Sequence, residues 1–113
     1  MPLFERRKHA RFRLPGISTE FGEVVNFSET GFAIFRKGAL DINIGGELKL
    51  AVAFDGQIRQ VTGKIVRLEE LAVRRWEIGL ELTDLTDADR EWLRSLADRG
   101  EHITTGPRVW LAA

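Results

Sequence analysis

The stretch ELKLAVAFDGQIRQVTGKIVRLEE, Glu47–Glu70, decides the fold. Its first half alternates between apolar and polar residues, which is the pattern of a strand with one face in a core. Asp55-Gly56 is a strong signal for a two-residue turn, because both positions of such a turn require positive φ. The second half reads as the returning strand, and Gly63 allows a bulge or bend where the apolar phase changes near Ile65-Val66. The stretch therefore predicts a long antiparallel hairpin.

Further strands are predicted on both sides of this hairpin. The residues before it are rich in β-forming types, and those after it alternate between charged and apolar side chains. Gly38–Glu47 reads as a loop with a turn at Gly45-Gly46. The predicted flanking strands are Ile17–Phe27, Gly31–Lys37 and Arg74–Leu82, the last with Trp76, Ile78, Leu80 and Leu82 facing inward.

The period of the apolar residues changes after Asp84, where LTDADREWLRSLADRG places them at helical spacing. Thr86 is a predicted N-cap, and acidic residues follow in the first turn, where the helix dipole favours them. Gly100 is a predicted C′ stop. The tail from Glu101 has no clear secondary-structure pattern. Five or more antiparallel strands followed by one helix indicate a mostly β protein, a small closed barrel with the helix packed against it.

The composition limits the class of protein. The 113 residues are 43% hydrophobic and 30% charged, which is typical of one soluble globular domain. The chain has no cysteine, so disulfides and cysteine-ligated metals are excluded. No apolar run could span a membrane, and the first residues do not resemble a secretory signal. We therefore expect a cytoplasmic protein without direct membrane insertion.

The residues that usually perform catalysis are scarce. The two histidines are His9 and His102, the serines lie near no recognisable base, and no phosphate-binding glycine loop is present. The carboxylates are scattered as on a solvated surface. We therefore expect no enzyme, no metal site and no cofactor.

The charge is unevenly distributed although the net charge is zero. Residues 1–13 hold five basic side chains and one acidic side chain, and the remaining 100 residues hold 12 basic and 16 acidic ones. A domain that binds a nucleic-acid polymer usually carries positive charge over a broad face. The acidic body therefore favours a small anion held locally over a long polyanion.

Two short motifs stand out before the hairpin. The first is Arg7-Lys8-His9-Ala10-Arg11, an R-x-x-x-R preceded by Arg6, and the second is Asn26-Phe27-Ser28-Glu29-Thr30-Gly31, an N-x-S-x-x-G. Alone, the first could be a solvated basic arm. The second could be a turn whose side chains bond local backbone and whose glycine supplies an unusual φ. Their combination, in this order and ahead of a barrel pattern, is the informative feature.

With these motifs the sequence resembles the PilZ domain family, the bacterial receptor module for cyclic di-GMP, over residues 5–99. The GKIVR and WEIGLEL strands and the following helix are also similar to the family. The resemblance implies a six-stranded antiparallel β-barrel, or a slightly truncated one, with a C-terminal α-helix. Only Phe12 to Val25 separate the two motifs, so we expect the first barrel strand to be short or merged with the next.

The resemblance also implies a function and its residues. Residues 1–13 would be a basic ligand-clamp segment, residues 14–84 the barrel, residues 86–99 the helix and residues 100–113 a tail. The ligand would be cyclic di-GMP, bound between the clamp and the barrel surface. The residues carried over as binding it are Arg6, Arg7, Arg11, Asn26, Ser28 and Gly31.

Simple chemistry supports these residues. The guanidinium of arginine is a planar fork that suits phosphate oxygens and guanine O6 and N7, and its face can stack on a purine. Asn26 and Ser28 share a face if their stretch is extended, and a glycine lets backbone approach closely. We expect Phe4–Arg13 to become ordered over the barrel on ligand binding and so to signal to a protein effector.

Two alternatives remain. One is a PilZ-like protein-interaction domain that does not bind the nucleotide. The other is a nucleic-acid binder that uses the basic arm. The predicted β-strands, however, are acidic or mixed in charge and lack the basic, aromatic face that binding of single-stranded nucleic acid requires. The identity of the bound ligand distinguishes these two alternatives from a cyclic di-GMP receptor.

Overall fold

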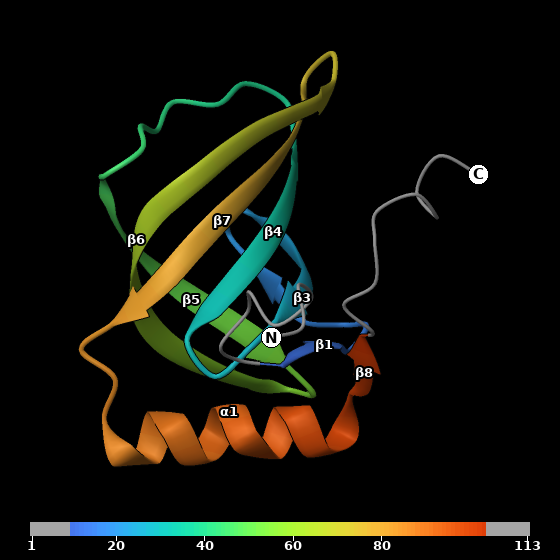
Figure 1. Ribbon diagram of the computed structural model, residues 1–113, viewed down its shortest axis with the longest axis vertical. Coiled ribbons are helices and arrows are strands. Elements are labelled where there is room, and N and C mark those ends of the chain that lie inside the picture. Colours follow the sequence, from blue (N-terminus) through green and yellow to red (C-terminus); the bar gives the residue numbers. More distant parts are fainter. Residues whose placement is uncertain (1–9, 104–113) are drawn as a thin grey trace, which may run out of the picture.

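The computed structural model describes residues 10–103. Eight strands and one helix lie in this part of the chain (Figure 1). The strands are β1 (Arg11–Arg13), β2 (Ser18–Thr19), β3 (Gly22–Phe27), β4 (Gly31–Lys37), β5 (Glu47–Phe54), β6 (Gln57–Ala72), β7 (Arg75–Thr83) and β8 (Glu101–Ile103), and the helix is α1 (Asp87–Arg99).

The sheet closes on itself. Its strand order is β2-β5-β6-β7-β4-β3-β1-β8, and an additional pairing joins β2 to β3. Six strands, β2 to β7, therefore form a closed antiparallel ring, and β1 and β8 extend the sheet beyond β3. The predicted six-stranded barrel with a C-terminal helix is confirmed.

The central hairpin forms as the sequence predicts. Asp55 and Gly56 have φ of 53° and 78°, and Phe54 pairs with Gln57 across the turn. The register of β6 against β7 shifts between Ile65 and Arg67, where the apolar phase changes in the sequence. The extra residue is an exposed valine, so this bulge lets one long strand turn different faces to the core.

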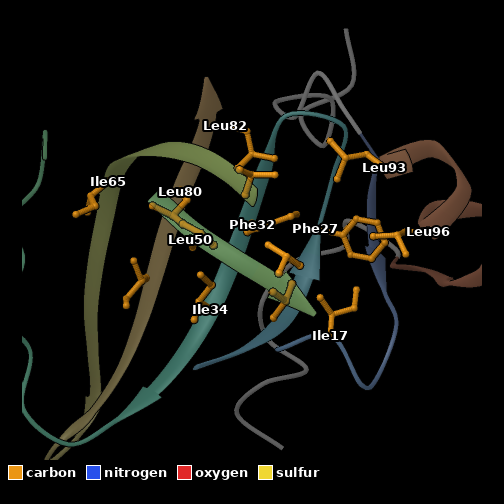
Figure 2. Close-up of a cluster of buried hydrophobic side chains, with 14 residues drawn as sticks. Ile17, Phe27, Phe32, Ile34, Leu50, Ile65, Leu80, Leu82, Leu93 and Leu96 are labelled. Atoms are coloured by element: carbon orange, nitrogen blue, oxygen red, sulfur yellow. The ribbon is translucent and has the colours of Figure 1, made fainter. Parts of the chain in front are cut away.

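The barrel interior is filled by aliphatic side chains and two phenylalanines (Figure 2). Leu93 and Leu96 of α1 join this core, so the helix covers one end of the barrel (Figure 1). Trp76 was expected to face inward, but it is only half-buried and does not belong to the core. It lies where β7 pairs with the ends of β4 and β6, opposite Arg36 and Glu70.

The predicted strand over Ile17–Phe27 is divided in two. Thr19 Oγ1 accepts hydrogen bonds from the N–H groups of Phe21 and Gly22, which folds a tight turn between β2 and β3. Gly22 has φ of 148°, and a Cβ there would lie 1.9 Å from the Phe35 carbonyl oxygen. The first strand of the closed ring is therefore short, as the spacing of the two motifs predicts.

The helix begins as predicted but ends differently. Thr86 and Asp89 form a reciprocal capping box, with both bonds 3.0 Å long. Gly100 has extended backbone instead of the left-handed conformation of a C′ stop, and the chain continues directly into β8. A Cβ at Gly100 would lie 3.0 Å from the carbonyl oxygen of Arg13. Glycine therefore permits a close approach of the chain after the helix to β1.

Candidate functional site

A β-bulge directs Asn26 away from the core. The register of β3 against β4 shifts between Val24 and Asn26, so that Val24 faces Ile34 and Asn26 faces Ala33. Val24 and Phe27 are both buried, although they are three residues apart. Simple alternation from Val24 would turn Asn26 inward, and the extra residue places it on the outer surface instead.

Arg11 on β1 joins the two sequence motifs. Its Nε donates a hydrogen bond of 2.9 Å to Asn26 Oδ1, and its Nη2 donates to the same oxygen. Its Nη1 donates to Ser28 Oγ over 3.1 Å. One guanidinium thus engages both polar side chains of the N-x-S-x-x-G motif, 15 and 17 residues away in sequence. The structure therefore brings together three of the six predicted site residues, Arg11, Asn26 and Ser28.

Ser28 also shapes the turn between β3 and β4. Its N–H donates to the Gly31 carbonyl over 2.9 Å, and its Oγ accepts the N–H of Thr30 over 3.2 Å. The Thr30 carbonyl accepts the N–H of Leu82, which fixes the turn against β7. Ser28 is only 3% exposed, and it is the one buried polar residue among those described. Its hydroxyl therefore serves the turn and Arg11 together.

Gly31 allows two strands to lie close together. A Cβ at this position would lie 2.6 Å from the Leu80 carbonyl oxygen on β7 and 3.8 Å from Arg11 Nη1. Its φ is not in the left-handed region, so the interpretation that this glycine supplies an unusual turn angle is wrong. The residue is needed because β4 and β7 run close together beneath the site.

The strand β1 belongs to the sheet. Phe12 pairs with Phe27 of β3 and with His102 of β8, at ring centroid distances of 5.9 and 5.4 Å. The expectation that the whole of Phe4–Arg13 orders only with ligand does not fit Arg11–Arg13, which form β1 in the structure. Residues 1–9 of the predicted clamp, which include Arg6 and Arg7, lie outside the described residues.

Arg13 lies two residues from Arg11 and therefore on the same face of β1. Its Nη1 lies 3.7 Å from Glu101 Oε1 on β8. Neither Arg13 nor Glu101 is among the residues that the family resemblance carries over. The spacing of two residues between Arg11 and Arg13 could have indicated that both side chains share one face of a strand. No feature of the sequence indicated that the tail pairs with β1.

A second group of polar side chains lines a surface cavity away from the two motifs. This cavity, of about 360 Å³, contains none of the motif residues. In it, the Arg59 guanidinium lies 2.8 Å from Asp89 and 5.2 Å from the centre of the Trp92 ring. The Thr86 N–H and then Arg59 hold the pKa of Asp89 below its ordinary value of 3.8. The cavity is lined by Gln57, Ile58, Arg59, Gln60, Asp89 and Trp92.

Residues 10–103 include no cluster of three potential metal ligands. They also include no helix long and apolar enough to cross a membrane.

Comparisons with known proteins agree with the observed fold. The family model described as PilZ domain matches residues 5–99. Among solved structures, the inhibitor of motility MotI/DgrA of Bacillus subtilis superimposes with a TM-score of 0.62 at 18% identity, over 83% of this chain and 50% of that one. YcgR of Escherichia coli, solved in complex with c-di-GMP, superimposes with a TM-score of 0.69 at 9% identity, over 83% of this chain and 45% of that one. The chain thus spans about half the length of both proteins. No curated protein matches it.

Proposed function

The chain belongs to the PilZ domain family, and from this premise we propose that it is a receptor for cyclic di-GMP. The observation that carries the proposal is the contact of Arg11 with both Asn26 and Ser28. These three residues come from the two motifs that the sequence predicts to act together. Arg11 lies on β1, Asn26 on β3 and the buried Ser28 in the turn between β3 and β4.

The cluster has the chemistry that this ligand requires. Asn26 uses its oxygen for Arg11, so its amide N–H₂ group is the part that suits guanine O6 or N7. Arg11 is directed by two fixed acceptors, which lowers the conformational entropy that it would lose on binding a phosphate. A preorganised guanidinium of this kind is well suited to an anion or to the edge of a guanine.

We assign the signalling step to the residues before β1. Arg6 and Arg7 would close over the bound nucleotide, because its two negative charges would offset the repulsion among the clustered cations. This closure would change the surface that a protein effector meets. The proposal includes a cytoplasmic location for the protein and a protein effector as its partner. It includes no binding of a nucleic-acid polymer.

A calorimetric titration of the full chain with cyclic di-GMP tests the proposal. We expect saturable binding by the wild type. Asn26→Ala and Ser28→Ala should weaken binding and also lower stability, because Ser28 holds the turn and both accept from Arg11. Val61→Ala, which removes apolar volume from the core on β6, is the control that lowers stability and leaves affinity unchanged.

The outcome also separates the alternatives. An absence of heat with the wild type would favour an interaction domain that does not bind the nucleotide. Binding of a polymer with a steep dependence on salt would favour a nucleic-acid binder.

A further inference from the structure

The outer face of β1 presents two guanidinium groups. Side chains alternate along a strand, and Phe12 packs toward Phe27, so Arg11 and Arg13 both point to the other side. Their Cα atoms are separated by roughly 6.7 Å, the rise of two strand residues. Arg13 therefore lies beside the contact between Arg11, Asn26 and Ser28.

The two arginines are held very differently. Arg11 directs three donors at Asn26 and Ser28 and is half-buried. Within residues 10–103, Arg13 forms one ion pair, with Glu101 at 3.7 Å, and the two side chains are 54% and 77% exposed. An ion pair of this length between solvated side chains contributes little to stability. Arg13 can thus change its partner at low cost.

We propose that Arg13 is a further ligand-binding residue and that Glu101 occupies its guanidinium until a phosphate replaces the carboxylate. This inference rests on the proposed function. A carboxylate and a phosphate present similar pairs of oxygens to the guanidinium fork, so one can substitute for the other. Cyclic di-GMP carries two phosphates, and a second arginine on the same face gives the second phosphate a partner.

Glu101 is placed for this role by a segment outside the matched family region. The family match ends at residue 99, and β8 begins at Glu101, directly opposite Arg13 in the register. Gly100 allows the close approach, since a Cβ there would lie 3.0 Å from the Arg13 carbonyl oxygen. The carboxylate competes for Arg13 and also repels an anion. Glu101 therefore reduces the affinity of the site for its ligand.

The test measures the dissociation constant of cyclic di-GMP for full-length variants. Arg13→Ala should weaken binding about fivefold or more, because a charge-assisted contact is lost. Arg13→Lys should weaken it less, because the charge remains and the fork is lost. Glu101→Gln should strengthen binding about two- to fivefold, since a weak competitor and one negative charge are removed. Arg94→Ala, which removes one positive charge from an exposed position on α1, is the matched control and should leave affinity unchanged.

Wild-type affinity in Arg13→Ala would overturn the inference while leaving the proposed function intact. A loss of affinity in Glu101→Gln equal to that in Arg13→Ala would also overturn it, because the ion pair would then be a structural support of the site. A wild type that binds no cyclic di-GMP would refute the proposed function and this inference together.

Discussion

Replacement of Gly31 by alanine separates a structural from a ligand-binding reason for the last residue of the N-x-S-x-x-G motif. The added Cβ would lie 2.6 Å from the Leu80 carbonyl oxygen, a backbone atom on the neighbouring strand β7. Backbone cannot rotate away as a flexible side chain does, so β4 and β7 must separate where Gly31 faces Glu81. Their separation strains the turn that holds Ser28.

The expected magnitude follows from the cost of overpacking. Inserting a methyl group into well-packed structure typically costs about 1–3 kcal/mol, which lowers the melting temperature of a domain near this size by roughly 4–15 °C. Gly63→Ala is the matched control on β6. Its Cβ would lie 3.3 Å from the nearest atom, the Glu81 carbonyl oxygen, so we expect a loss below about 1 kcal/mol.

The assay is urea unfolding of both variants, together with a titration with cyclic di-GMP at a temperature where each is folded. We expect Gly31→Ala to be clearly less stable than Gly63→Ala. If Gly31→Ala retained wild-type stability and lost only its affinity, the glycine would serve the approach of the ligand, and the reasoning from Leu80 would be refuted.

Three further predictions concern the basic segment and the helix cap. Arg7→Ala and Arg11→Ala should each weaken cyclic di-GMP binding about ten- to a hundredfold by calorimetry with the fold retained, whereas Lys8→Ala should do little; equal losses in all three would indicate a diffuse basic patch. Arg11→Ala should also lower stability, because it removes the donor to Asn26 and Ser28. Saturating ligand should suppress tryptic cleavage after Arg7 before it affects cleavage after Arg94 on the helix, and equal protection with and without ligand would contradict closure of the segment. The lowered pKa of Asp89 means that its carboxylate stabilises the fold above its unfolded pKa of about 4, and that this contribution is lost as pH falls through the lower folded value. Asp89→Asn should therefore remove part of the dependence of the urea midpoint on pH between about 2 and 5, and an unchanged profile would refute the assignment.

Most of the barrel could be predicted from the sequence because its signals are local. Asp55-Gly56 specifies its own turn, and alternation specifies which face of β5 enters the core. Thr86 and Asp89 form their capping box within four residues. Features of this kind depend on near neighbours in the chain, so they can be predicted without knowledge of the tertiary structure.

The site could be predicted only in part because its geometry depends on contacts between distant segments. The motifs identify Arg11, Asn26 and Ser28, but the β3 bulge that turns Asn26 outward depends on pairing with β4. The alternation pattern gives no warning that Gly31 faces a carbonyl of β7. The pairing of β8 with β1 joins the two ends of the described chain, and no local sequence signal predicts it.

The most direct test of the central claim is a titration of the isotope-labelled protein with cyclic di-GMP, followed by backbone amide chemical shifts. We predict saturable changes centred on the amides of Arg11, Asn26 and Ser28, with little change at Gln57–Gln60 in the distant cavity. The absence of any shift, or shifts concentrated at that cavity, would contradict the claim that this surface binds cyclic di-GMP.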